Sequence, residues 1–240
     1  MVFASPSPSG RSLVDHLRQH PPANHRLVMW GVDPDLRTLG WARIQTAFTK
    51  PSTAPAAIEH LWLGVWAPPT THKDDIDQTN AMIGSFKRRS SGVQEQTPWW
   101  EGHERSGIPQ FVTAEAQRVY PDRNERPGTV VAKANDLLRL AQISGAFQGM
   151  FADADYARCR SFKPDVWKHN AKKEAMHTAV IQRVGEGPVH VWMGTDVTTY
   201  GSLSEVHKKL TKAAGRLDVF DALCLAYFGI DEIMCGRWVI

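Results

Sequence analysis

Three apolar stretches follow one another closely in the first third of this 240-residue chain. They cover residues 27–33 (LVMWGVD), 40–48 and 59–67, and their apolar patterns over this length are typical of strands. The first link holds Pro34 and Gly40, which are turn residues. Strands in close succession with short links usually pair with their neighbours in antiparallel fashion. The pattern therefore predicts an antiparallel meander at the start of a sheet.

The remainder of the chain carries both strand and helix patterns. Residues 108–115 and 156–162 have strand patterns, and residues 188–194 suggest a further strand. This mixture predicts an α/β fold, with a mixed five-stranded sheet whose first three strands are antiparallel and whose faces are covered by helices. The expected helices cover residues 75–87, 129–151, 172–184, 202–216 and 217–230.

Composition divides the chain into a tail and one domain. Residues 1–25 are rich in Pro, Ser, His and Arg, and we expect a flexible tail with a short helix over residues 12–19. A single domain is expected over residues 26–240. Within it, residues 68–108 and 185–217 are predicted to be insertions.

Charge and cysteine content restrict the class of protein. The net charge of +3 and the isoelectric point of about 8.8 permit nucleic-acid binding without requiring it. Cys159, Cys224 and Cys235 are too widely spaced to indicate a thiolate zinc site or a disulfide framework. No apolar run approaches the roughly 20 residues of a membrane span, and the N-terminus lacks the apolar core of a secretory signal. We expect an intracellular protein with no membrane partner.

Four carboxylates occupy positions from which they could converge. Asp33 and Glu115 each end a predicted strand. Asp218 and Asp221 begin the final helix three positions apart, so they share a helix face. Each acid alone has an ordinary alternative explanation, such as a turn residue or an acid that favours the helix dipole. The four acids together, in this order along the chain, indicate a shared site where no single acid does.

Converging carboxylates require a cation. Like charges at short range repel and raise one another's pKa. Hard oxygen ligands suit Mg²⁺ or Mn²⁺. Two such ions can hold the attacking and leaving oxygens of a phosphodiester. The sequence therefore predicts a site with two Mg²⁺ or Mn²⁺ ions for phosphodiester hydrolysis.

Three segments, in this order, resemble the motifs of the RuvC-type Holliday-junction resolvases. These are MWGVDPDLRTLGWARI (29–44), FVTAEAQRVYP (111–121) and LDVFDALCLAYFGI (217–230). Residues 135–147 and 162–175 also resemble phage-type members of that family. The chain departs from the family at Asp35, where a glycine is usual, and in the size of its insertions.

The resemblance implies an RNase H-like fold and a metal-dependent endonuclease. It implies metal ligation and catalysis by Asp33, Glu115, Asp218 and Asp221. It also implies a homodimer whose two sites cut symmetric strands of a four-way DNA junction, leaving a 5′-phosphate and a 3′-hydroxyl.

Several cations and one aromatic residue are candidates for contact with DNA. Cations near the acids would hold phosphates, and an aromatic side chain could stack on a base. Solvated helix faces and core packing are the competing explanations. The candidates are Lys168, Lys172, Lys173, Lys208, Lys209, Arg88, Arg89 and Tyr120.

Other functions compete with junction cleavage. An RNase H-like nuclease that acts on flaps, other branched DNA or an RNA–DNA hybrid would use the same acids. A non-catalytic DNA-binding protein would not need all four of them. An actin-like ATPase or a sugar kinase is disfavoured because the chain has no glycine-rich phosphate loop of that type.

Overall fold

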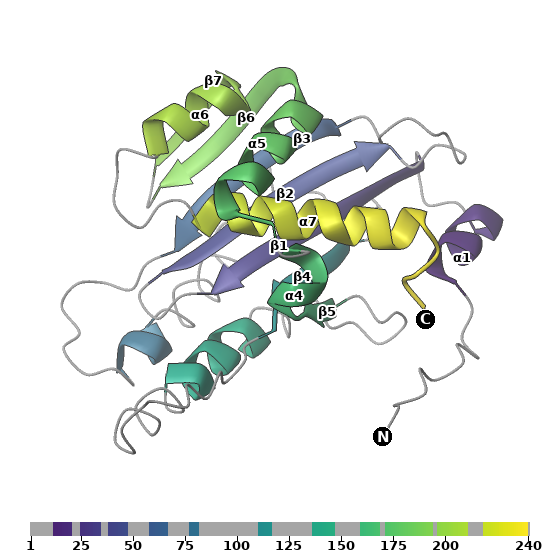
Figure 1. Cartoon of the computed structure of the whole chain (residues 1–240), viewed down its shortest axis with the longest axis horizontal. Coiled ribbons are helices and arrows are strands. Elements are labelled where there is room, and N and C mark those ends of the chain that lie inside the picture. The colour runs from purple at the N-terminus through teal and green to yellow at the C-terminus, as the bar shows by residue number, and fades with distance from the viewer. Residues whose placement is uncertain are drawn as a thin grey trace.

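Seven strands form one mixed sheet in the computed structural model of the chain (Figure 1). The strand order is β5-β4-β1-β2-β3-β6-β7. The strands are β1 (Arg26–Pro34), β2 (Leu39–Ala47), β3 (Ile58–Trp66), β4 (Gln110–Glu115), β5 (Cys159–Phe162), β6 (Glu186–Met193) and β7 (Asp196–Ser202). The structure describes residues 12–20, 25–34, 38–47, 58–66, 77–81, 110–116, 136–146, 159–168, 171–193, 196–210 and 218–239.

The middle of the sheet has the predicted arrangement. β1 pairs with β2 and β2 pairs with β3, both in antiparallel fashion. β4 lies parallel to β1 on the other side, and β5 lies parallel to β4. The predicted fold class, a mixed α/β sheet whose first three strands are antiparallel, is confirmed.

The sheet has two strands more than the predicted five. β6 adds to β3 in parallel, and β7 pairs with β6 in antiparallel fashion. Both lie in residues 185–217, which the sequence suggested to be an insertion. The pattern at residues 188–194 indicated β6, but β7 lies at the sheet edge with most of its residues exposed. An exposed edge strand has no buried face, so its sequence shows no apolar alternation.

The labelled helices lie over one face of the sheet, which α7 (Asp218–Met234) crosses over β1 and β2 (Figure 1), whereas Ile143 of the helical residues 136–146 packs on the opposite face. The other labelled helices are α1 (Leu13–Gln19), α4 (Pro164–Lys168), α5 (Lys173–Val184) and α6 (Leu203–Leu210), and residues 77–81 and 136–146 are also helical. Within the described residues, no helix combines the length and the apolar character that a membrane crossing requires.

Successive residues of β1 contribute to two cores, one on each face of the sheet. Leu27 and Met29 join the core that contains α7, α1 and α6. Val28 and Trp30 join a second core rich in tryptophan, to which residue Ile143 also belongs. This alternation follows from the period of two along a strand. It places β1 at the centre of the domain.

The helix α1 is packed against the body of the protein. Leu13, Val14 and Leu17 are buried, and the Leu13 N–H donates to the Trp238 carbonyl at 2.7 Å. The predicted short helix is therefore confirmed. Residues 12–20 do not form part of the flexible tail that the composition predicted, because their apolar side chains pack into the core beside the C-terminal end of α7.

Small residues bring α7 close to the sheet. A β-carbon at Gly31 of β1 would overlap the carbonyl oxygen of Ala222 in α7. The Thr113 hydroxyl of β4 lies 2.9 Å from the Leu225 carbonyl oxygen and 3.0 Å from that of Trp30. These contacts fix the position of α7 relative to β1 and β4.

Candidate active site

Two of the predicted acids end neighbouring parallel strands. Asp33 is the penultimate residue of β1, and Glu115 is the last residue of β4. The register pairs Val32 with Ala114, so the next position on each strand holds an acid. Parallel strands bring equivalent positions to the same edge of the sheet. Asp33 and Glu115 therefore emerge side by side.

The first turn of α7 stands above this edge. Gly40 of β2 is the cross-strand partner of Asp33. A β-carbon at Gly40 would lie 2.5 Å from the carbonyl carbon of Asp218, so the helix backbone rests on this glycine. The Thr38 hydroxyl donates to the Asp218 carboxylate at 3.2 Å. Asp218 and Asp221 consequently come close to the acids at the strand ends.

The other three acids act electrostatically on Asp33. The pKa of Asp33 is raised well above its ordinary value, first by burial and then by the carboxylates of Asp221, Glu115 and Asp218. Lys168 opposes this shift. Ionisation of Asp33 is therefore unfavourable, and a bound cation would relieve that cost.

Asp221 is held by two residues of α5. Its Oδ1 lies 2.7 Å from His177 Nε2, and its Oδ2 lies 2.7 Å from Lys173 Nζ. Asp221 and His177 are 4% and 3% exposed. Burial would raise the pKa of Asp221, but the hydrogen bonds from His177 and Lys173 prevail and lower it. Asp221 is thereby kept ionised and fixed in place.

Glu115 has a lysine partner from α4. Lys168 Nζ lies 3.0 Å from Glu115 Oε2. The same ammonium group lies 4.7 Å from the centre of the Trp167 ring, a cation–π distance. Since α4 begins two residues after the end of β5, the strand positions Lys168 beside the acids. The lysine neutralises part of the carboxylate charge.

The donor set of the four acids fits a hard divalent cation. All of the candidate ligands are carboxylate oxygens, which Mg²⁺ and Mn²⁺ prefer. Across the ranges that the structure describes, no three His, Cys, Asp or Glu side chains are arranged closely enough to hold an ion. The two lysines and His177 engage the carboxylates instead. The acids are thus gathered and paired with cationic or hydrogen-bonding partners.

The other predicted DNA contacts fall into two groups. Lys172 is exposed at the N-cap of α5, and Lys208 and Lys209 are exposed in the last turn of α6. The α6 helix reaches the site through His207, whose ring is 4.8 Å from Phe220 of α7. The remaining candidates, Arg88, Arg89 and Tyr120, lie outside the described residues.

Sequence reasoning missed three residues that shape the site. His177 lies four positions after Lys173, and this spacing places both on one face of α5, which is the signal that could have found them together. Thr38 and Gly40 carry no such signal, because their contacts with Asp218 exist only in the folded chain.

No protein-family model matches the sequence, and no curated protein matches it either. Solved structures do have a similar fold. One is Thermus thermophilus RuvC in complex with a Holliday junction substrate, with a TM-score of 0.47 and 15% identity over 89% of this chain and 98% of that one. A second is Thermus thermophilus RuvC, with a TM-score of 0.46 and 15% identity over 89% of this chain and 99% of that one. A third is the yeast mitochondrial Holliday junction resolvase Ydc2, with a TM-score of 0.45 and 11% identity over 93% of this chain and 87% of that one. At this level of identity, the similarity concerns the fold alone.

Proposed function

We propose that this protein is a metal-dependent endonuclease that cuts four-way DNA junctions. The observation that carries the proposal is geometric: Asp33 and Glu115 end neighbouring parallel strands in register, and the backbone of Asp218 at the start of α7 rests on Gly40, the cross-strand partner of Asp33. Glu115 and Asp218 come from β4 and α7, far from Asp33 in sequence. A cluster of this kind, positioned by a sheet edge and a helix start, suits phosphodiester hydrolysis.

The four acids would hold the ions and orient the phosphate. Two Mg²⁺ or Mn²⁺ ions, when bound, would activate water and stabilise the leaving oxygen. His177 fixes Asp221 through its hydrogen bond, which orients a ligand as an outer partner does in metal sites. Lys168 and Lys173 already touch the acids, so each can turn its ammonium group to a phosphate oxygen held there.

The junction as substrate rests on the order of the sequence motifs, which resembles the RuvC-type resolvases. A homodimer would present two such sites to symmetric strands, and each cut would leave a 5′-phosphate and a 3′-hydroxyl. The exposed lysines Lys172, Lys208 and Lys209 would contact further phosphates along the arms.

The test is cleavage of four synthetic substrates in Mg²⁺ or Mn²⁺: a four-way junction, a flap, a duplex and an RNA–DNA hybrid. We expect paired symmetric nicks on the junction alone. Asp33→Asn should abolish cutting while junction binding is largely kept. If the flap or the hybrid is cut as fast as the junction, the protein is a nuclease of broader specificity and not a junction-specific enzyme. If Asp33→Asn still cuts, the proposed role of this acid is wrong.

A further inference from the structure

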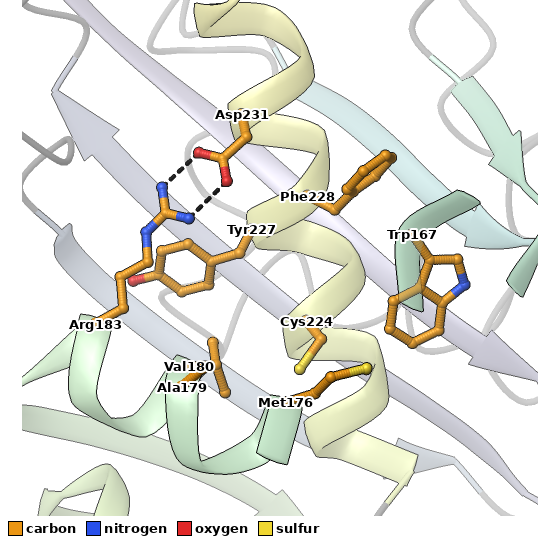
Figure 2. Close-up of a pocket in the computed structure, with 9 residues that line it drawn as sticks. All are labelled: Trp167, Met176, Ala179, Val180, Arg183, Cys224, Tyr227, Phe228 and Asp231. Carbon is orange, nitrogen blue, oxygen red and sulfur yellow. Dashed lines mark hydrogen bonds and ion pairs between the residues drawn. The ribbon is translucent and has the colours of Figure 1, made fainter. Parts of the chain in front are cut away.

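A pocket of about 260 Å³ opens between α5 and α7 (Figure 2). This volume is near the small end of ligand pockets, so it has room for a single ring system. Its walls are formed by Trp167, Met176, Ala179, Val180, Arg183, Cys224, Tyr227, Phe228 and Asp231.

The pocket continues the acid site along the same two helices. Cys224 lies one turn beyond Asp221 on α7, and Met176 lies one turn beyond Lys173 on α5. α4 contributes Trp167, the neighbour of the lysine that binds Glu115. One helical turn advances about 5.4 Å and successive nucleotides of a duplex strand are about 3.4 Å apart, so one turn spans between one and two nucleotides. A strand held at the acids would therefore bring an adjacent nucleotide to the pocket.

Most of the residues that line the pocket are apolar, and three of them, Trp167, Tyr227 and Phe228, are aromatic. Met176, Val180 and Phe228 lie around its centre, and Cys224 projects from α7 between them (Figure 2). Thioether and aromatic side chains favour contact with π faces. Burial and the Asp221 carboxylate raise the pKa of the Cys224 thiol to about 12, so the thiol is uncharged and serves as a wall.

The far end of the pocket is polar. Arg183 binds the Asp231 carboxylate through two hydrogen bonds and lies 4.6 Å from the centre of the Tyr227 ring (Figure 2). Tyr227 is 6% exposed, and its hydroxyl has no hydrogen-bond partner within the described part of the chain. The exposed polar groups at this end are the Arg183 guanidinium and the Asp231 carboxylate, which line the pocket. A ligand with a polar edge could hydrogen-bond with these two groups, whereas an alkyl chain could not.

We propose that this pocket receives an unpaired nucleobase from the strand whose phosphate the acids hold. A base combines the two properties that the pocket requires, namely an apolar face and a polar edge. The inference rests on the proposed function only in that the acid cluster binds DNA. Stacking of a base on aromatic side chains tolerates any sequence, so the pocket would help to hold an opened strand without reading it.

Two neighbouring residues of α5 provide a matched pair of variants. Ala179 is exposed at the pocket wall, so Ala179→Trp fills the pocket without disturbing the core. Thr178 is also exposed but is not part of the lining, because the next position is rotated by about 100° around the helix. Thr178→Trp therefore adds the same side chain away from the pocket.

The test combines these variants with abasic DNA. The dissociation constant of the full-length protein is measured for a four-way junction and for its single strands in Ca²⁺, with strand integrity checked on a gel. Each base within three nucleotides of the bound phosphate is removed in turn. At one position, the abasic site should weaken binding by wild-type protein about tenfold. Ala179→Trp should bind intact DNA about tenfold more weakly and lose nothing further at that abasic site, while Thr178→Trp should behave as wild type.

Two outcomes would overturn the proposal that the pocket receives a base. Either no abasic position weakens binding by the wild-type protein, or an abasic site weakens binding by Ala179→Trp as much as it weakens binding by wild type. Cutting is measured in parallel in Mg²⁺. If the protein cuts junctions but no abasic site weakens its binding, the proposed function holds and the proposed role of the pocket is wrong. If an abasic site weakens binding but the protein does not cut, the role of the pocket holds and the endonuclease activity is wrong. If the protein binds none of these DNAs, both proposals are wrong.

Discussion

The backbone of Asp218 rests on Gly40: a β-carbon at this glycine would lie 2.5 Å from the Asp218 carbonyl carbon. Gly40 is also the cross-strand partner of Asp33. A residue without a side chain thus sets the separation between the acid on β1 and the first acid of α7. The geometry of the acid cluster depends on this contact.

Gly40→Ala should therefore impair cutting more than folding. The added methyl group must push the start of α7 away from β2, and a displacement of about 1 Å at a catalytic site can cost about 100-fold in rate. Overpacking of this kind should lower the free energy of unfolding by about 1–3 kcal/mol. Single-turnover cutting of a junction and urea denaturation measure the two effects.

Gly145→Ala is the control for this substitution. A β-carbon at Gly145, in the helix of residues 136–146, meets nothing within 4 Å. Alanine should stabilise that helix by up to about 1 kcal/mol and leave cutting unchanged. If Gly40→Ala cuts at the wild-type rate, the contact with Asp218 does not set the catalytic geometry.

Asp33→Asn should stabilise the metal-free protein at neutral pH. Burial and the neighbouring carboxylates raise the pKa of Asp33, so the ionised acid destabilises the folded state. The gain should appear at pH 7 as a higher midpoint of urea denaturation. It should be complete above the raised pKa, shrink as the pH falls, and vanish below the ordinary Asp pKa of about 3.9, where both states are protonated. Urea denaturation between pH 3 and pH 8 in a chelator measures this.

Asp136→Asn tests whether the effect is specific to the cluster. Asp136 has a side chain that is 44% exposed and a weak ion pair with Arg139 at 3.9 Å. Its removal should change stability by less than about 0.5 kcal/mol at any of these pH values. A stability gain for Asp33→Asn that is the same at pH 3 as at pH 7 would show that repulsion among the acids is not its cause.

Leu13→Ala should destabilise the whole domain. Leu13 is fully buried and its N–H is bonded to Trp238, so α1 belongs to the core beside α7. Truncating a buried leucine costs about 2–5 kcal/mol. Asp15→Ala on the same helix removes only an exposed ion pair with Arg18 and should cost less than about 1 kcal/mol. Equal stability of the two variants would mean that α1 does not contribute to the fold.

Lys172→Ala should weaken DNA binding in proportion to one lost phosphate contact. The slope of log K against log salt concentration should become shallower by about 0.9, and affinity should fall about equally for all junction sequences. Arg18→Ala removes a cation from α1, which lies at the opposite end of α7 from the acids (Figure 1), and should leave the slope unchanged. An unchanged slope for Lys172→Ala would place this lysine outside the DNA interface.

The elements with buried faces could be predicted from the sequence. The three first strands and the strand that ends at Glu115 have continuous or alternating apolar patterns, because their side chains enter one core or the other. β7 could not be predicted, because an exposed edge strand has no apolar face. The packing of α1 was missed because a few apolar residues stood in a segment whose composition is otherwise polar.

The candidate site was only partly accessible from the sequence. The four acids could be selected because each lies at or near the start or end of an element, and Glu115, Asp218 and Asp221 act electrostatically on Asp33 in the structure. Their roles as metal ligands remain predictions. The pairing of Asp221 with His177 depends on how α5 docks against α7, which no local pattern encodes. The same holds for the contact between Gly40 and Asp218.

The most direct test of the metal site is a calorimetric titration of the chelator-treated protein with Mn²⁺. We expect saturable binding by the wild-type chain, with proton release as cations replace protons on the acids. Asp33→Asn and Glu115→Gln should each lose most of this binding, while Asp136→Asn should keep it. Undiminished Mn²⁺ binding by Asp33→Asn and Glu115→Gln, or no binding by the wild-type chain, would contradict the proposal that these acids hold the ions.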